Sequence, residues 1–261
     1  MSFQLKAFLR ALFLIFSAGV CTCILAPLGI LAILLDRSGQ SFSAVQRVWA
    51  NWLLRANGVR LNRKGLENLE ERHSYIFISN HMSLLDIPGI ISALPVPIRF
   101  IAKRSLTWVP IFGWSLSLSG HILIDRASPQ SALKSLKRAA FLLKNGTSIM
   151  VFPEGTRSPD GLVKEFKAGA FLLAQKAEAP VVPVSISGTY EMLPRTGWCF
   201  WPGTIKVSIG KPISTEGLSQ RQVRSLMEEV RARVIQNLNP EPQTHKAQGD
   251  RPNAFAQKAR P

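Results

Sequence analysis

The longest uncharged stretch of the chain lies near its N-terminus, over residues 11–35, and is almost entirely apolar. It exceeds the about 20 apolar residues that a helix needs to cross a bilayer, so we predict a membrane segment. A cleaved signal peptide is the alternative, but the apolar stretch continues well past Ser17-Ala18-Gly19, its best small-residue cleavage candidate. The pattern therefore favours a segment that stays on the protein.

Two membrane topologies fit this apolar segment. In a single span, the N-terminus lies across the membrane from the rest of the chain, and Lys6 and Arg10 oppose the tendency of basic residues to stay on the cytoplasmic side. In a shallow re-entrant hairpin, the helix breaks near Pro27 and Gly29, because proline interrupts helical hydrogen bonding, and both ends stay on one side. We favour the hairpin, which keeps the basic residues beside an anionic leaflet.

Beyond residue 40, short apolar runs that indicate strands alternate with segments in which apolar residues recur at helical spacing. This alternation predicts an α/β fold: a central mixed, mostly parallel sheet flanked by helices, with the N-terminal membrane-embedded helical segment attached. The predicted strands are 59–62, 74–80, 97–102, 121–124, 148–152, 181–187 and 205–209. The predicted helices are 41–57, 82–92, 129–145, 169–177 and 219–239.

The first of these helices is amphipathic, with Val45, Val48, Trp49, Trp52 and Leu53 at helical spacing. Two tryptophans on one face suit a membrane interface, and ordinary core packing explains the same stripe equally well.

The chain divides by composition into three parts. Residues 1–40 form the predicted membrane-anchoring helical segment, and residues 41–239 form one α/β domain. Residues 240–261 are polar, rich in Pro, Gln and Lys, and have little to bury, so we predict a disordered tail.

The chain is strongly basic, with 32 Lys and Arg against 16 Asp and Glu and a formal net charge of +16. Nucleic acid, an anionic membrane and phosphorylated substrates all attract such a charge. No zinc-ligand spacing, basic helix with heptads or RNA-binding motif is present, so we expect membrane and phosphate partners and no nucleic acid. The four His and three Cys form no cluster at metal-ligand spacing, so we predict no metal and no cofactor.

Polar residues follow several predicted strands, as expected for a site at one edge of a sheet. His81 follows the second strand, and Asp86 comes five residues later. Positions five apart do not share a helix face, but the pair can meet if His81 lies in the turn before the helix and Asp86 on its first turns. The carboxylate would then hold Nδ1–H and leave Nε2 as a base. No protein nucleophile is apparent, so the base would activate a substrate hydroxyl directly.

Basic residues follow other predicted strands. Arg126 and Arg157 each offer a planar fork of donors that matches a phosphate, and the Gly155-Thr156 turn adds backbone N–H groups and a hydroxyl. A structural ion pair is the alternative role for each arginine. Lys103 is a further and weaker candidate for substrate binding.

Four motifs occur in the order found in the glycerolipid acyltransferase family, and the resemblance covers about residues 60–215. The segment 80–86, NHMSLLD, resembles the NHxxxxD motif of that family. The segments 120–126 (GHILIDR), 152–158 (FPEGTRS) and 182–186 (VPVSI) are similar to its second, third and fourth blocks.

This resemblance implies an enzyme that moves a fatty acyl group from acyl-CoA or acyl carrier protein to the sn-2 hydroxyl of 1-acylglycerol-3-phosphate. His81 would be the general base and Asp86 its orienting partner. Arg126 and the segment Glu154-Gly155-Thr156-Arg157 would bind the glycerol phosphate.

Such an enzyme would face the cytoplasm at the inner membrane, because both acyl donors are cytoplasmic. Another lysolipid or glycerol 3-phosphate is the alternative acceptor. A non-catalytic membrane protein that binds lipid on the same fold is the alternative of another class.

Overall fold

A seven-stranded sheet forms the centre of the described part of the chain, which in this computed structural model comprises residues 3–36, 39–70, 73–109, 112–124, 129–196 and 199–238. The strand order is β1-β7-β6-β2-β5-β3-β4, and every neighbouring pair is parallel except β6 and β7. The strands are β1 (Arg60–Lys64), β2 (Ile76–Ser79), β3 (Ile98–Lys103), β4 (Ile122–Ile124), β5 (Ser148–Val151), β6 (Val181–Ser187) and β7 (Thr204–Ile209). The predicted mixed, mostly parallel sheet is therefore confirmed.

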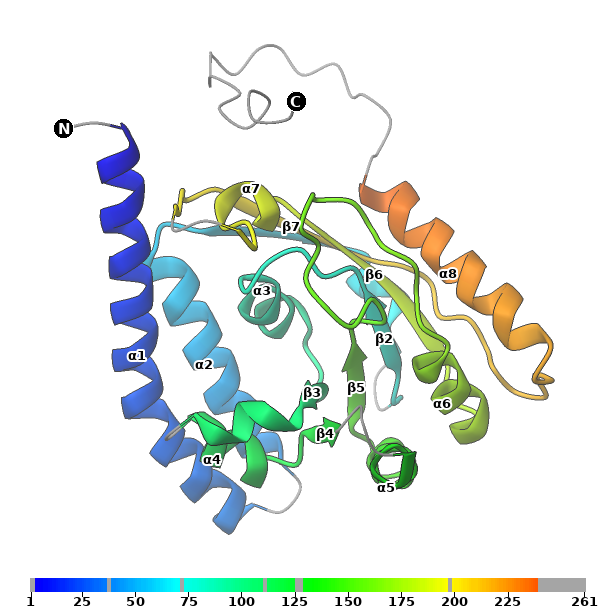
Figure 1. Cartoon of the computed structure of the whole chain (residues 1–261). Coiled ribbons are helices and arrows are strands. Elements are labelled where there is room, and N and C mark those ends of the chain that lie inside the picture. The colour runs from blue at the N-terminus through cyan, green and yellow to red at the C-terminus, as the bar shows by residue number, and fades with distance from the viewer. Residues whose placement is uncertain are drawn as a thin grey trace.

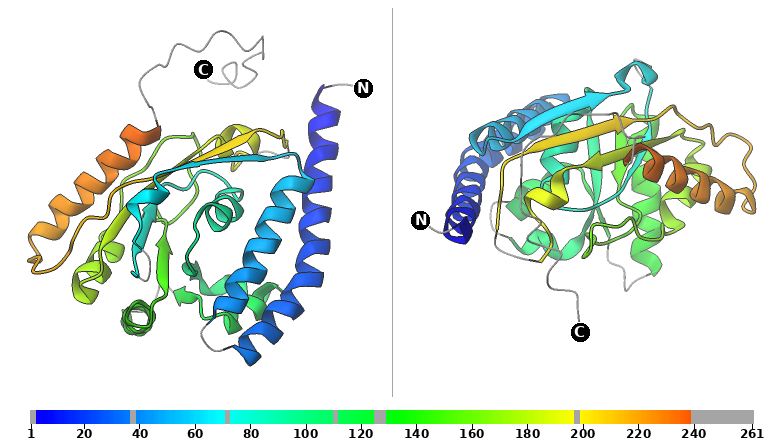
Figure 2. Two further views of the ribbon diagram at one scale, coloured as in Figure 1. Left: turned by 180° about the vertical axis from the view of Figure 1, so that it is seen from behind. Right: turned by 90° about the horizontal axis from the view of Figure 1, so that it is seen from above.

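Helices cover both faces of this sheet (Figures 1 and 2). On one side lie α1 (Phe3–Leu35), α2 (Gln40–Ala56) and α3 (Asp86–Ala93). On the other lie α5 (Pro129–Lys144), α6 (Gly169–Ala177) and α8 (Gln222–Leu238). The short helices are η1 (Leu66–Asn68), η2 (Arg104–Trp108), α4 (Phe112–Leu118) and α7 (Thr189–Met192).

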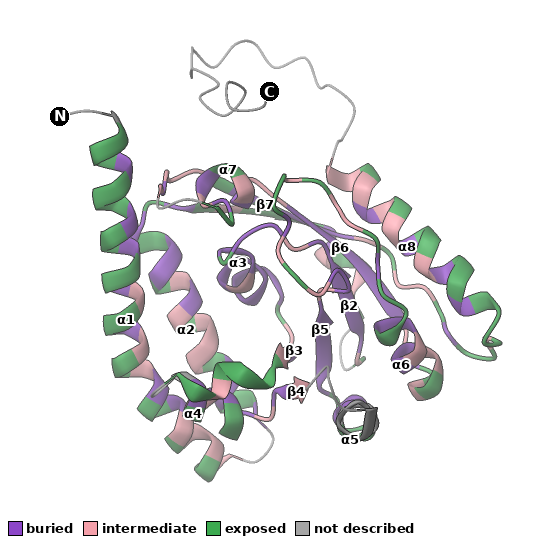
Figure 3. Cartoon of the chain, viewed as in Figure 1, coloured by how far each residue is buried: buried purple, intermediate pink, exposed green. Residues whose placement is uncertain are grey.

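Strand β2 shows why the protein has a core on each face of the sheet. Successive side chains of a strand point to opposite faces. Tyr75, just before β2, and Phe77 therefore join the core under α2 and α3, whereas Ile76 and Ile78 join the core under α5, α6 and α8. Because both faces are covered, the central strands are buried throughout (Figure 3) and their sequences read as continuous apolar runs.

The long helix α1 has an apolar surface that the protein leaves uncovered. Only 17% of its most apolar 18-residue stretch is buried. The outward face includes Phe13, Phe16, Leu34 and Leu35, which are between 50% and 78% exposed. By length and composition this helix is able to cross a membrane, in agreement with the predicted membrane segment.

The predicted break in this segment is wrong, because α1 continues through Pro27 to Leu35. Proline removes one helical hydrogen bond, and packing against α2 on both sides of Pro27 offsets that loss. Ala26 is buried, and Gly29 packs under the ring of Phe42. Farther along the two helices, Trp49 Nε1 donates to Thr22 Oγ1 over 3.1 Å. The chain therefore reverses after α1, between its last residue and Gln40.

The N-terminal end of α1 also contacts the α/β domain. The backbone N–H of Phe200 donates to the carbonyl of Ala7 over 3.3 Å. The guanidinium of Arg10 lies over the ring of Trp201, 4.9 Å from its centre. The start of α1 therefore lies against the loop that precedes β7, and domain contacts occur near both ends of the helix.

The amphipathic stripe predicted on α2 divides between different surroundings. Leu53 is buried in the core, whereas Val45 and Trp49 line a cavity described below. Val48 and Trp52 are 56% and 43% exposed. The stripe is wider than one packed face because α2 packs on the α/β core and on α1 and also lines the cavity.

The predicted tail, residues 240–261, lies outside the described residues.

Two glycines of α1 offer a matched test of this packing. A side chain at Gly29 would meet the Phe42 ring at 3.2 Å, whereas one at Gly19 would meet nothing within 4 Å. We expect Gly29→Leu to destabilise the protein by about 1–3 kcal/mol through overpacking, and Gly19→Leu to be neutral or stabilising. Thermal unfolding of both variants in the same detergent measures the difference. Equal melting temperatures would contradict this packing of α1 on α2.

Candidate active site

The site lies where parallel strands of the sheet end. His81 follows β2, Gly155 and Arg157 follow β5, and Lys103 ends β3. In the register of β2 and β5, Ile76 pairs with Ile149, so these two strands end side by side. The predicted gathering of polar residues at one edge of the sheet is present for these positions.

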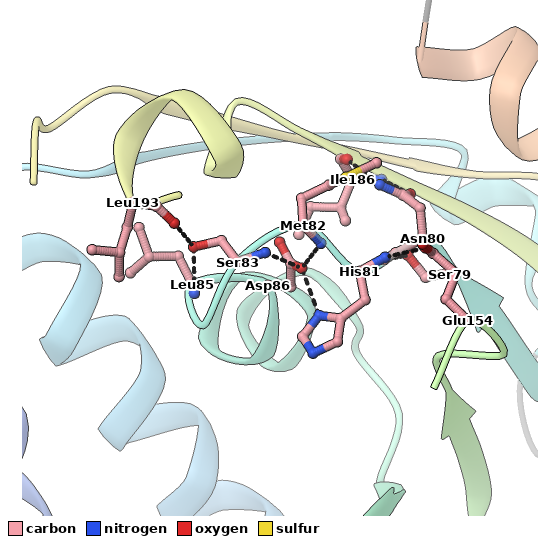
Figure 4. Close-up of polar contacts among 10 residues, drawn as sticks. All are labelled: Ser79, Asn80, His81, Met82, Ser83, Leu85, Asp86, Glu154, Ile186 and Leu193. Atoms are coloured by element: carbon pink, nitrogen blue, oxygen red, sulfur yellow. Dashed lines mark hydrogen bonds and ion pairs between the residues drawn. The ribbon is translucent and has the colours of Figure 1, made fainter. Parts of the chain in front are cut away.

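His81 and Asp86 form the contact expected from their spacing (Figure 4). His81 lies in the turn after β2, and Asp86 is the first residue of α3. His81 Nδ1 lies 2.8 Å from Asp86 Oδ2. The same oxygen accepts the backbone N–H groups of Met82 (2.6 Å) and Ser83 (2.9 Å), and Asp86 is fully buried. Because a carboxylate oxygen accepts all three hydrogen bonds, Nδ1 carries a proton, and in the neutral ring Nε2 is then the nitrogen with the lone pair.

Two buried polar side chains hold the turn that carries His81. Asn80 donates to the carbonyl of Ile186 (2.8 Å) and accepts the N–H of the same residue (2.9 Å), which ties the end of β2 to β6. Glu154 accepts the N–H of His81 (2.8 Å) and of Lys164 (3.1 Å). Burial raises the pKa of the Glu154 carboxyl, and these two hydrogen bonds offset part of the rise. Glu154 does not line the cavity, so its contacts favour a positioning role over the substrate contact expected from the sequence.

The ring of His81 is fixed on a second side by Phe152. The two rings stack with their centres 4.1 Å apart and their planes 14° from parallel. Among the described residues, His81 Nε2 has no hydrogen-bond partner, and His81 lines a cavity of about 350 Å³. The unbonded nitrogen is therefore available to a bound molecule.

The cavity beside His81 combines a polar part with a long apolar wall. His81, Lys103 and the segment 155–157 supply polar groups. The apolar wall comes from five helices and one strand: α1 (Leu25, Ala26), α2 (Phe42, Val45, Trp49), α3 (Ile87, Ile91), β3 (Phe100), η2 (Leu106) and α4 (Leu116). A cavity lined mainly by apolar side chains, with a few convergent polar groups, is typical of a binding site for an amphipathic ligand.

A second histidine, His121, lines the same cavity, but its ring nitrogens are occupied. Nδ1 accepts the backbone N–H of Phe100 (2.9 Å), and the side-chain amide of Gln46 lies 3.1 Å from Nε2. Burial, assisted by the charge of Arg99, lowers the pKa of His121 to about 3. His121 is therefore neutral at physiological pH and has no free nitrogen to act as a base, whereas His81 has one.

The predicted phosphate-binding residues are only partly brought together. Gly155, Thr156, Arg157 and Lys103 line the cavity with His81. Arg126 lies outside the described residues. Burial, and then the nearby charge of Arg195, lower the pKa of Arg157, whereas the charge of Asp86 raises it.

Arg195 was not found from the sequence. It is a lone basic residue in a loop between α7 and β7, outside the four motifs, and nothing in its neighbours along the chain marks it. Its Nη1 donates to the carbonyl of Arg157 over 3.1 Å.

The sequence and the fold resemble those of known proteins. Residues 60–187 match the Acyltransferase family. The chain is 38% identical over 192 residues to the 1-acyl-sn-glycerol-3-phosphate acyltransferase of Pseudomonas aeruginosa, covering 73% of this chain and 74% of that protein. It is also 38% identical over 184 residues to the Saccharomyces cerevisiae protein of the same name, covering 69% of this chain and 60% of that protein.

A solved structure agrees with these sequence matches. The crystal structure of the 1-acyl-sn-glycerophosphate (LPA) acyltransferase PlsC from Thermotoga maritima superposes with a TM-score of 0.78 at 31% sequence identity. The match covers 92% of this chain and 98% of that chain, so it extends well beyond the four motifs. On these grounds together, the chain belongs to the Acyltransferase family.

Proposed function

We propose that the protein transfers a fatty acyl group from acyl-CoA or acyl carrier protein to the sn-2 hydroxyl of 1-acylglycerol-3-phosphate, which yields phosphatidic acid. The observation that carries this proposal is the free Nε2 of His81, held by Asp86 in a cavity with an apolar wall and Arg157. The names of the Pseudomonas and Thermotoga relatives support the same acceptor.

The bonding of His81 supports direct transfer without an acyl-enzyme. Nε2 takes the proton from the acceptor hydroxyl while the hydroxyl oxygen attacks the thioester carbonyl, and the buried Asp86 carboxylate stabilises the imidazolium that forms. The tetrahedral intermediate then collapses, the carbon–sulfur bond breaks, and the imidazolium returns its proton to the thiolate. General-base assistance of this kind contributes about 10²–10⁴-fold to the rate.

The two sides of the cavity suit the two parts of these substrates. The apolar wall from α1, α2, α3 and α4 matches a fatty acyl chain. Arg157, with the N–H groups and hydroxyl of Gly155 and Thr156, matches a phosphate headgroup. Arg126 belongs to the same proposed phosphate site on the strength of its motif alone.

We also infer that α1 holds the enzyme on the cytoplasmic face of the inner membrane, where both acyl donors occur. The exposed apolar face of α1 supports membrane contact. The contacts of Ala7 with Phe200 and of Arg10 with Trp201 support an N-terminus on the same side as the domain. A simple span would separate these partners, because residues 11–35 would lie between them in the bilayer.

Replacement of the proposed base tests the reaction. We expect His81→Ala to lower kcat at least ~10²-fold, and Asp86→Asn to lower it through the wrong tautomer of His81. His73→Ala is the matched control, because the His73 side chain is 60% exposed and outside the cavity. Turnover is measured with purified, folded protein in mixed micelles. A folded His81→Ala variant with near-normal turnover would contradict the mechanism.

The acceptor is tested with a panel that contains 1-acylglycerol-3-phosphate, other lysolipids and glycerol 3-phosphate. We expect Arg157→Ala to raise KM for 1-acylglycerol-3-phosphate more than KM for the donor, and Arg157→Lys to restore binding only in part, because ammonium lacks the bidentate fork. Arg224→Ala, at a position 83% exposed on α8, serves as control. If only the donor KM rises, Arg157 belongs to the carrier site.

The orientation of α1 is tested by a cysteine at Ser2 in a variant that lacks Cys21, Cys23 and Cys199. We expect no labelling by a membrane-impermeant maleimide in intact cells and full labelling after permeabilisation. Labelling of intact cells would show an external N-terminus and contradict the inferred orientation.

A further inference from the structure

Two arginines, Arg157 and Arg195, lie near each other beside the turn that carries His81. Arg157 follows β5 and is half-buried, and Arg195 follows α7 and is exposed. Arg195 Nη1 donates to the backbone carbonyl of Arg157 over 3.1 Å, which holds the second guanidinium against the first residue. In the described part of the chain, the ion pairs involve neither arginine. Burial, and then the charge of Arg195, lower the pKa of Arg157, whereas the charge of Asp86 raises it, so the two guanidinium groups are close enough to interact electrostatically.

The loop that carries Arg157 is tied to the turn that carries His81. The backbone N–H of Ser158, the next residue, donates to the carbonyl of His81 over 2.8 Å. Ser158 is fully buried, and its hydroxyl closes the following turn through Asp160 and Leu162. These hydrogen bonds hold the backbone next to Arg157 in place relative to the proposed base, His81.

The loop that carries Arg195 is tied to the same turn from the other side. The hydroxyl of Ser83 donates to the carbonyl of Leu193 over 2.7 Å, as Figure 4 shows. Tyr190 Oη, on α7, donates to the carbonyl of Pro159 over 3.1 Å, which joins the helix before the Arg195 loop to the loop that carries Arg157. Both loops are therefore anchored within three residues of their arginine, and both anchors reach the turn of His81 and Ser83.

An anion with two charges is the ligand that this arrangement fits. Two guanidinium groups offer two planar forks, and each fork matches a pair of phosphate oxygens. A phosphate monoester has three terminal oxygens and carries about −1.5 to −2 charge at pH 7. A phosphate diester has two terminal oxygens and one charge, so it would leave one of the two arginines unmatched.

We propose that Arg195 and Arg157 form a subsite for the dianion of a phosphate monoester, and that Arg195 sets the preference for monoester acceptors over phosphodiester lysolipids. This proposal rests on the proposed function and deepens it. Arg195 acts on binding of the acceptor headgroup and takes no part in proton transfer. Lysolipids whose phosphate is esterified to a headgroup alcohol carry one charge less and one terminal oxygen less than the monoester. We therefore expect them to bind this subsite more weakly, even without a steric clash.

The test compares two acceptors that differ only at the phosphate: 1-acylglycerol-3-phosphate and its phosphate methyl ester. For each acceptor, kcat and KM are measured at saturating donor in the full-length wild type, Arg195→Gln, Arg195→Lys and Arg221→Gln. Glutamine keeps much of the side-chain length without the charge. Arg221 is an exposed arginine before α8, and its charge, unlike that of Arg195, does not shift the pKa of Arg157, so Arg221→Gln is the matched control.

We expect Arg195→Gln to raise KM for the monoester about tenfold, as loss of a charge-assisted hydrogen bond predicts. We expect this variant to change three other quantities by less than about twofold relative to the wild type: KM for the methyl ester, KM for the donor, and kcat. Arg195→Lys should restore part of the preference, and Arg221→Gln should match the wild type. An unchanged monoester preference in folded Arg195→Gln overturns the proposal. An equal loss with both acceptors also overturns it, because a merely structural role of Arg195 has that effect.

A binding measurement separates this proposal from the proposed function. Without donor, glycerol 3-phosphate should raise the melting temperature of the wild type, and its phosphate methyl ester should raise it less. Arg195→Gln should lose this difference, and a wild type without the difference overturns the dianion subsite. If the wild type shows this difference in melting temperature but acylates neither 1-acylglycerol-3-phosphate nor its methyl ester, the proposed function is refuted and the subsite remains supported.

Discussion

The geometry of the site depends on one buried carboxylate. Asp86 Oδ2 receives the imidazole N–H of His81 and two backbone N–H groups of the turn that precedes α3. A buried charge is tolerated only when hydrogen bonds compensate its lost hydration, so the turn must close tightly around Asp86. That closure fixes the tautomer and direction of His81, and it starts α3 at Asp86. Asn80 and Glu154 then tie this turn to β6 and to the loop after β5.

Much of the fold is predictable from the sequence because both faces of the sheet are covered. The central strands appear as short apolar runs, and α5, α6 and α8 each show one buried stripe, so their bounds are found to within a few residues. The contact of His81 with Asp86 is also predictable, because a turn followed by a helix can bring positions five apart together. These features depend on local spacing, which a single sequence contains.

Other features depend on contacts between residues that are far apart in the sequence, and the sequence alone does not predict them. Pro27 suggests a break, but packing of α1 on α2 keeps the helix continuous. The oxygens of Glu154 accept the backbone N–H groups of His81 and Lys164, and its motif does not reveal these contacts. Arg195 lies 38 residues from Arg157 in a loop without a motif, so only the folded chain places the two together.

The wall of the cavity includes residues of α1, the helix with the large apolar exterior. The proposed anchor and the acyltransferase domain are consequently not separable modules. A truncation that removes α1 to obtain a water-soluble enzyme would also open one side of the proposed acyl site and expose the α2 surface beneath it. Efforts to solubilise this protein are better directed at the outward residues of α1, such as Phe16 and Leu35, while its inward stripe stays unchanged.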